Sequence, residues 1–276
     1  MRKEFAKSLT DNFNQYDKQV FLTGDLGYMA LEEVQKVFGN RFINAGVAEQ
    51  NMITVAAAMA QEGFIPWAYS ISPFVTLRPY EQLRNDVCLH DLPVKVVGNG
   101  GGYGYGIMGA THHNLEDIGS MRMLPHMKVI VPLIASDVDE AVQMMLSDKH
   151  PNYLRLNLAA SFEETIAPFA PWRKIKSGKG LVVIGTGPVL GNLKALPKAL
   201  YDELDIWALS VFPVTELPQD LKQAIEGCRK VLTLEEHKGQ GGLNEALAPF
   251  LLKELTTPVS YTNLYAHGYP SGRYGD

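Results

Sequence analysis

Short apolar runs alternate with longer segments of helical periodicity along most of the chain. The apolar runs have the length of buried β-strands, and the segments between them repeat apolar residues every three to four positions. Strands are predicted at residues 19–23, 41–45, 64–69, 94–97, 128–131 and 153–156, and helices at residues 31–38, 50–61, 74–89 and 137–146. This alternation favours a parallel sheet flanked by helices.

The alternation stops near residue 157 and resumes near residue 181. Residues 161–179 include Pro168, Pro171 and Gly178 and are predicted to form a linker. Beyond it, strands are predicted at residues 181–184, 206–211, 230–235 and 259–264, and helices at residues 189–203 and 243–254. The predicted fold class is α/β, with a larger domain at residues 1–160 and a smaller α/β domain at residues 180–276.

Composition and charge narrow the classes of function. The 276 residues are 46% hydrophobic, which is enough to bury a full core, and the net charge of −5 makes nucleic acid and anionic membranes poor partners. We expect no secretory signal and no membrane span, because no apolar run has the required length. The two cysteines, Cys88 and Cys228, fit neither a metal site nor a disulfide and favour a cytoplasmic location.

A glycine-rich segment covers residues 98–109, with seven glycines in twelve positions. Gly104, Gly106 and Gly109 match the spacing of a dinucleotide-binding fingerprint. They lie several residues beyond the predicted strand, however, and no helix begins directly after them, which disfavours a nicotinamide site. The glycines predict instead a backbone that passes close to a ligand, or a loop that moves.

One glutamate lies at a strand-to-helix junction. Glu49 follows the predicted strand at residues 41–45 and opens the alanine-rich helix, with small or apolar neighbours. A carboxyl group there can exchange a proton with a heterocyclic nitrogen with little competition from water. The alternative is a first-turn glutamate that complements the helix dipole. Taken alone, the residue leaves both interpretations open.

Further motifs accompany Glu49 along the chain. In order they are Thr23-Gly24-Asp25-Leu26, Gly46-Val47-Ala48-Glu49-Gln50-Asn51-Met52, residues 80–86, Leu92-Pro93-Val94, Thr111-His112-His113, residues 124–132, residues 153–157 and residues 232–237. This series resembles the C-terminal half of the transketolase family of thiamine diphosphate enzymes, which includes 1-deoxyxylulose-5-phosphate synthase. The resemblance runs from about residue 5 to about residue 265. It implies a pyrimidine-binding domain at residues 1–160 and a transketolase C-terminal domain at residues 180–276.

The resemblance also implies a partner. The family's diphosphate domain carries Gly-Asp-Gly and a metal-binding asparagine, whereas here Gly24-Asp25-Leu26 breaks that motif. We therefore expect a separate diphosphate-binding transketolase subunit that supplies the Mg²⁺ ligands, an α2β2 assembly, and no metal ligand in this chain. The expected cofactors are thiamine diphosphate and Mg²⁺, and the expected substrates are sugar phosphates.

The same resemblance implies catalytic and binding roles for specific residues. Glu49 would hydrogen-bond N1′ of the aminopyrimidine, and His112 would face the reacting oxygens of the substrate. Arg155 would grip the sugar phosphate through its planar fork of donors. The cofactor-binding residues implied are Asp25, Leu26, Glu49, Phe74 and Arg78.

Several of these residues have a structural alternative. Phe74 could be a core residue of its helix, Asp25 a helix N-cap, and Arg155 a residue that caps the sheet edge. The chain also departs from the family, with Gly100 in place of a histidine and Met108 in place of an acidic residue, both of which would contact substrate hydroxyls. We therefore expect a preference for a deoxygenated, branched or otherwise non-standard sugar.

The predicted function is transfer of a two-carbon ketol unit between sugar phosphates by a transketolase-like subunit. Three alternatives remain open: a synthase of the 1-deoxyxylulose-5-phosphate type, a 2-oxo acid dehydrogenase β-subunit, and a non-catalytic assembly partner that uses the surface around Glu49.

Overall fold

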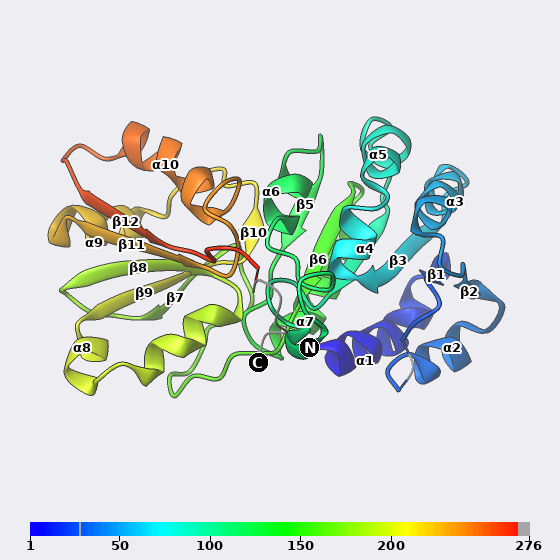
Figure 1. Ribbon diagram of the computed structural model, residues 1–276, viewed down its shortest axis with the longest axis horizontal. Coiled ribbons are helices and arrows are strands. Elements are labelled where there is room, and N and C mark those ends of the chain that lie inside the picture. Colours follow the sequence, from blue (N-terminus) through cyan, green and yellow to red (C-terminus); the bar gives the residue numbers. More distant parts are fainter. Residues whose placement is uncertain (28, 270–276) are drawn as a thin grey trace.

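Two β-sheets, side by side along the long axis of the molecule, form its framework (Figure 1). The computed structural model describes residues 1–27 and 29–269. In the first sheet the strand order is β10-β5-β6-β4-β3-β1-β2, and all neighbours run parallel except β10 and β5. Its strands are β1 (Gln19–Thr23), β2 (Phe42–Asn44), β3 (Ile65–Ile71), β4 (Lys95–Asn99), β5 (Lys128–Ile130), β6 (Asn152–Leu156) and β10 (Val211–Phe212).

Helices cover both faces of this sheet because its strands are apolar on both sides. On β1, Val20 and Leu22 face one hydrophobic cluster and Phe21 faces another, as the alternation of a strand requires. The first cluster lies under α3 (Glu49–Gln61), α4 (Ser72–Thr76), α5 (Tyr80–Gln82) and α6 (Asp117–Arg122). The second lies under α1 (Arg2–Asn12), α2 (Glu32–Phe38) and α7 (Asp137–Ser147).

The second sheet has the strand order β12-β11-β8-β9-β7, with only β7 antiparallel to its neighbour among the described residues. Its strands are β7 (Trp172–Lys176), β8 (Leu181–Thr186), β9 (Leu204–Leu209), β11 (Lys230–Glu235) and β12 (Ser260–Leu264). One face packs against α9 (Gln219–Cys228) and α10 (Leu243–Glu254). The other packs against the 3-10 helix Pro188–Ala195 and, through Tyr201, α8 (Lys198–Asp202).

The predicted α/β class, with a parallel sheet flanked by helices and a smaller α/β unit after it, is confirmed. Several element predictions need correction. The predicted linker contains β7, whose inward residues are Arg173 and Ile175, and the charged arginine obscured the strand pattern. The predicted helix at residues 74–89 is divided into α4, α5 and a π-helix (Leu83–Cys88), because Pro79 interrupts it. Pro197 likewise divides the helix predicted at residues 189–203.

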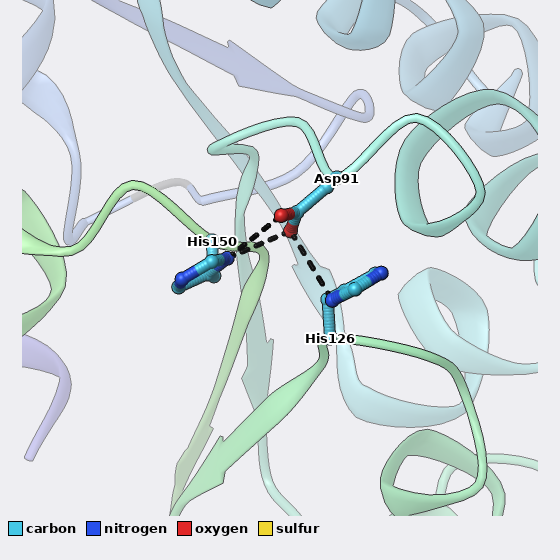
Figure 2. Close-up of side chains that lie close together, drawn as sticks. All are labelled: Asp91, His126 and His150. Carbon is cyan, nitrogen blue, oxygen red and sulfur yellow. Dashed lines mark hydrogen bonds and ion pairs between the residues drawn. The ribbon is translucent and has the colours of Figure 1, made fainter.

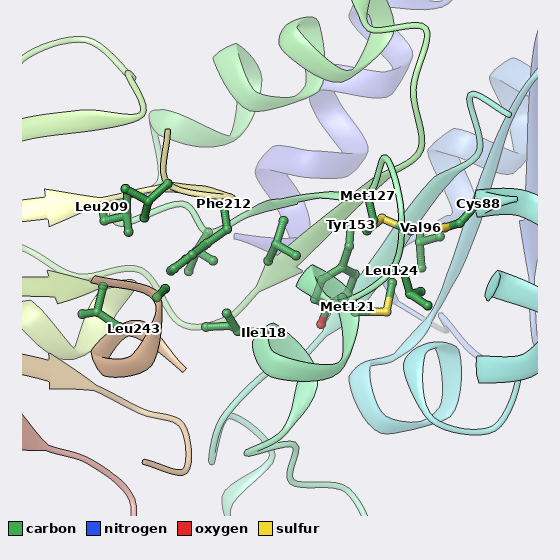
Figure 3. Packing of buried hydrophobic residues seen from close by; sticks show 14 of the residues in the cluster. Cys88, Val96, Ile118, Met121, Leu124, Met127, Tyr153, Leu209, Phe212 and Leu243 are labelled. Carbon is green, nitrogen blue, oxygen red and sulfur yellow. The ribbon is translucent and has the colours of Figure 1, made fainter. Parts of the chain in front are cut away.

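One of the hydrophobic clusters spans both units. β10 follows β9 of the second sheet yet pairs with β5 of the first, so the chain crosses between the sheets at residue 210. Figure 3 shows the result, with Leu209, Phe212 and Leu243 packed near Ile118 of α6. A buried ion pair joins the units as well: Nη1 and Nη2 of Arg173 donate to the Asp137 carboxylate at 2.7 and 2.6 Å.

None of the helices among the described residues combines the length and the apolar character that crossing a bilayer would require.

Candidate active site

The carboxyl ends of the parallel strands meet at one edge of the first sheet, and the predicted site residues gather there. β2 lies on one side of β1 and β3 on the other, so the chain reverses direction across the sheet between β1 and β3. Crevices at such switch points are where open α/β sheets bind ligands. Glu49, the first residue of α3, lies at this switch point: a Cβ added to Gly24 after β1 would lie 3.7 Å from Glu49 Oε1 and 3.8 Å from Ser70 Oγ of β3.

Four of the predicted residues form a continuous row. Nη1 of Arg78 donates to Oε1 of Glu49 at 2.9 Å, and the Arg78 guanidinium lies 3.8 Å from the centroid of the Phe74 ring. The Phe74 ring in turn meets the His112 ring edge to face, with centroids 5.2 Å apart. Glu49 is 5% exposed, whereas the Arg78 side chain is 45% exposed. A buried carboxylate is therefore held at the base of a half-open site by a long side chain that reaches solvent.

Asp25 and Leu26 lie at the same edge, directly after β1. The Asp25 carboxylate accepts a hydrogen bond from Asn44 Nδ2 at 3.0 Å, and its backbone N–H donates to Gly46 O at 3.4 Å. The alternative that Asp25 caps a helix is excluded, since α2 begins at Glu32 and has Leu31 as its N-cap. Phe74 likewise is half-buried beside His112 rather than part of the core.

The glycine-rich loop packs against side chains of its own chain. A Cβ at Gly98, Gly101 or Gly102 would lie 2.6 Å from Tyr153 Oη, 2.5 Å from Arg155 Nε or 2.5 Å from Glu236 Cδ. The absence of side chains at these positions is thus explained by close internal contacts, which the sequence-based expectation of a ligand or a moving loop did not include.

Tyr105 occupies the space next to Gly100. A Cβ at Gly100, whose φ is +75°, would overlap the Tyr105 ring. The Tyr105 hydroxyl accepts a hydrogen bond from Asn99 Nδ2 at 2.8 Å, and its ring centroid lies 5.9 Å from that of His112. Tyr105 is therefore a wall of the site that motif matching missed. Its signal in the sequence is a large side chain flanked by glycines on both sides, which Tyr103 shares.

Arg155 does not join the row, and in this structure its guanidinium is occupied by contacts with protein groups. Its side chain is 1% exposed, and Nε donates to Asp117 Oδ2 at 2.7 Å while Nη2 donates to Glu236 O at 2.9 Å. Burial alone would lower the pKa of Arg155, but the Asp117 and Glu236 charges raise it. The guanidinium holds the two units together, which agrees with the alternative that it is structural.

Asp117 is the centre of a buried polar network that the motifs did not indicate. Its Oδ2 accepts hydrogen bonds from Ser72 Oγ at 3.2 Å, Tyr153 Oη at 2.8 Å and Arg155 Nε at 2.7 Å. Ser72 begins α4, the helix that carries Phe74. The network therefore fixes the position of the aromatic residue relative to the loop that carries His112.

A cavity of about 720 Å³ lies elsewhere, between the glycine-rich loop and the carboxyl ends of β8, β11 and β12. Tyr103, Asn157, Lys194 and Glu236 are among the described residues that line it. The residues of the Glu49 row do not line this cavity.

Comparisons with known proteins agree with this geometry. The profile described as "Transketolase, pyrimidine binding domain" matches residues 1–160. A protein from Methanocaldococcus jannaschii described as a transketolase C-terminal section is 34% identical over 260 residues, covering 90% of this chain and 80% of that protein. One of the subunits of an apulose-4-phosphate transketolase from Phocaeicola vulgatus is 27% identical over 270 residues, covering 94% of this chain and 85% of that protein.

The chain is also similar to part of a longer protein and to a protein of solved structure. A 1-deoxy-D-xylulose-5-phosphate synthase from Clostridium perfringens is 25% identical over 272 residues, and the match spans 44% of its length. The solved structure of a protein described as "Split gene transketolase, inactive beta4 tetramer" superimposes with a TM-score of 0.84 at 27% identity, covering 98% of this chain and 90% of that one.

Proposed function

We propose, on the premise that this chain belongs to the transketolase family, that it is one subunit of a two-component thiamine diphosphate enzyme. The enzyme would transfer a two-carbon ketol unit between sugar phosphates. The observation that carries the proposal is the buried Glu49 carboxylate at the switch point, in a row with a guanidinium, an aromatic ring and an imidazole.

The residues around Glu49 fit an aminopyrimidine. Gly24 leaves room beside the carboxylate, and Ser70 Oγ is buried there without a hydrogen-bond partner among the described residues. A polar group of a ligand would satisfy it, as buried hydroxyls require. The Phe74 ring offers a flat apolar face for a heterocycle. Mg²⁺ and the diphosphate are assigned to the partner subunit, because this sequence lacks the motif that binds them.

Thiamine diphosphate, when bound, supplies a nucleophilic thiazolium carbon, which this chain's side chains do not offer. Glu49 would hold a proton at N1′ of the aminopyrimidine and so support proton exchange at the amino group of the same ring. Arg78 orients the Glu49 carboxylate through its 2.9 Å hydrogen bond, and its exposure lets it shift when a ring enters.

His112 would act on the substrate. The imidazole is half-buried between the Phe74 and Tyr105 rings, which fix its plane, and its Nδ1 lies 3.0 Å from Thr111 Oγ1. An imidazole N–H directed into the crevice can donate to a substrate oxygen where negative charge develops.

Exposed apolar side chains near the candidate site support the proposal of a partner chain. Val47, Leu77, Ile107 and Met108 are between 44% and 77% exposed, and each is near Glu49, Arg78 or His112 in sequence. Clustered exposed apolar side chains mark interaction surfaces. The similar proteins are described as a C-terminal section, one of several subunits and the product of a split gene. We therefore propose a diphosphate-binding partner subunit and an α2β2 enzyme in the cytoplasm.

The glycine-rich loop at residues 98–109 bears on the choice of substrate. Gly100 and Met108 replace polar side chains, and Tyr105 fills the space beside Gly100, so the wall is less suited to a fully hydroxylated sugar. One similar protein is named for apulose 4-phosphate. We propose a non-standard ketose phosphate as donor. The alternative, a decarboxylating synthase, is kept because of the similarity to 1-deoxy-D-xylulose-5-phosphate synthases.

Reconstitution tests the proposal. The purified chain alone should be inactive and should bind thiamine diphosphate weakly in calorimetry, with or without Mg²⁺. Activity should appear on mixing with a diphosphate-binding subunit, and kcat/KM should be higher for deoxy or branched ketose phosphates than for xylulose 5-phosphate with ribose 5-phosphate. Tight Mg²⁺-dependent cofactor binding by this chain alone would contradict the two-component proposal. Pyruvate consumption without ketol transfer would favour the synthase.

A further inference from the structure

Three side chains with metal-ligating atoms converge at the amino-terminal edge of the first sheet, opposite the edge that carries Glu49 (Figure 2). Oδ1 and Oδ2 of Asp91 lie 2.8 and 2.9 Å from Nδ1 of His150, and Oδ1 lies 3.8 Å from Nδ1 of His126. These ligand atoms all lie within 4.8 Å of one another. One carboxylate and two imidazoles therefore point at a common volume.

The strand register brings these residues together. β5, β6 and β4 are parallel neighbours, in which Lys128 and Lys95 both pair with Asn152. His126 and His150 each lie two residues before their paired position, and Asp91 lies in the loop before β4. Because the three residues belong to different loops, their spacing in the sequence predicted no metal site.

The surrounding structure holds the three loops in place. Asp91 and His126 have φ values of 52° and 64°, a left-handed conformation that residues other than glycine rarely adopt. The His150 carbonyl accepts a hydrogen bond from the buried Lys95 Nζ at 3.0 Å, and the His150 N–H donates to Asp148 Oδ1 at 3.1 Å. The His126 and His150 rings are nearly parallel, 12° apart in orientation. These constraints aim both Nδ1 atoms at Asp91.

We propose that Asp91, His126 and His150 bind one divalent transition-metal ion, and that Zn²⁺ is the ion that fits best. Two imidazole nitrogens and a carboxylate oxygen are a common donor set for Zn²⁺, with water as the fourth ligand. Bonds of about 2.0–2.2 Å place tetrahedral ligand atoms roughly 3.3–3.5 Å apart, so shifts of about 1 Å suffice here. The side chains are 35% to 49% exposed, which admits the ion.

The bound ion would tie together the loops that precede three neighbouring strands. A ligand that binds only the folded state stabilises it by mass action, so Zn²⁺ should raise the melting temperature. Because the site lies at the edge opposite Glu49, we assign it to the stability of the fold and not to ketol transfer. An Asp–His ion pair without metal affinity is the other interpretation of the same contacts.

The test uses the full chain without a histidine tag. Zn²⁺ titration by calorimetry should give one ion per chain, and Co²⁺ should give the visible absorption of a tetrahedral site. At a hundredfold excess over Kd, Zn²⁺ should raise Tm by roughly 5–10 °C. Asp91→Asn and His126→Asn keep residues that tolerate a left-handed backbone. Each, like His150→Gln, removes a ligand and should weaken Zn²⁺ binding by at least about 100-fold, since loss of an outer-shell partner alone costs about 10–100-fold.

His90→Ala is the matched control, because His90 is an exposed histidine next to Asp91 that is outside the cluster. It should bind Zn²⁺ and Co²⁺ like the wild type. The metal-free Tm of every variant shows whether it is folded, and Co²⁺ absorption reports the site directly. Wild-type affinity in the Asp91 and His126 variants, or equal losses in the His90 variant, would overturn the proposal.

Discussion

The Glu49 carboxylate is paired with the exposed Arg78 side chain, whereas Nε and Nη2 of the buried Arg155 guanidinium donate to protein groups. Both residues come from motifs of the same series. A motif identifies which residue type recurs at a position, but the neighbours of its side chain decide whether it can reach a ligand. That difference leads to opposite expectations for the two residues.

Glu49→Gln should leave folding and assembly intact while it slows the reconstituted enzyme by about 10²–10⁴-fold, the usual contribution of a positioned acid–base group. This equals roughly 3–5 kcal/mol of activation free energy. Hydrogen–deuterium exchange at C2 of the bound cofactor measures the step, and Glu81→Gln, at an exposed glutamate, is the control. Wild-type exchange in the Glu49 variant would remove this residue from the mechanism.

Arg155→Met should destabilise the chain by about 3–5 kcal/mol, because it leaves the buried Asp117 carboxylate without its charge partner. Any remaining activity should fall equally for phosphorylated and unphosphorylated substrates. Denaturant unfolding and kcat/KM for matched substrate pairs measure the two effects. A selective loss for the phosphorylated substrate, in Arg155→Met or in the milder Arg155→Lys, would support the phosphate-binding role instead.

At the scale of an element, the glycine-rich loop is a packed structure whose shape is set by residues far along the chain. Glu236 Oε1 accepts the Tyr103 N–H at 2.8 Å, and Glu236 Oε2 accepts from Asn157 Nδ2 at 3.2 Å. The sequence indicated that side chains were excluded from this loop. It could not indicate what excluded them, because most of the excluding groups, such as Tyr153, Arg155 and Glu236, lie far along the chain and one of them belongs to the other unit.

Gly102→Ala should destabilise the chain by roughly 1–3 kcal/mol. Its φ is +65°, and the new Cβ would displace Glu236 and its hydrogen bonds to the loop. Gly227→Ala is the matched control, since a Cβ there meets nothing within 4 Å and the residue lies in α9. It should stabilise by about 0.4–1 kcal/mol. Equal effects on the midpoint of chemical denaturation would contradict this account of the loop.

Glu235 makes the start of α10 sensitive to pH. Burial raises the pKa of Glu235 to about 7 from 4.5, although its carboxylate accepts the Leu243 and Asn244 N–H groups. A raised carboxyl pKa means that the native state prefers the protonated form. Stability should therefore fall as pH rises from about 4.5 to 7, by roughly 3 kcal/mol relative to Glu235→Gln, and then level off. A constant Tm difference between the two proteins from pH 5 to 8 would contradict this.

At the scale of the whole molecule, the alternation of apolar runs predicted two α/β units because most of the strands are locally apolar. The joins between the units were not predictable in the same way. β10 consists of only Val211 and Phe212, and β7 directs Arg173 inward, so neither has the pattern of an ordinary strand. Likewise, Asp91, His126 and His150 become neighbours only through strand order.

Arg173→Met should cost about 3–5 kcal/mol of stability, because Asp137 would stay buried without its partner between the two units. Adding Asp137→Asn should recover part of that loss in a double-mutant cycle. Lys198→Ala breaks an exposed pair with Asp202 and should change stability by less than about 0.5 kcal/mol. Thermal unfolding of the variants gives the comparison, and additive losses would mean that the pair is not coupled.

The position of β10 also bears on solubility. β5 has β6 on one side and β10 on the other, so the two residues of β10 cover β5, which would otherwise be an open edge of the first sheet. A fragment that ends near residue 160 would present the bare backbone of β5, which is a template for pairing with another chain. Such a fragment should form intermolecular β-structure at concentrations where the whole chain stays dispersed. The second unit thus protects the first from self-association, and this effect does not depend on any reaction at Glu49.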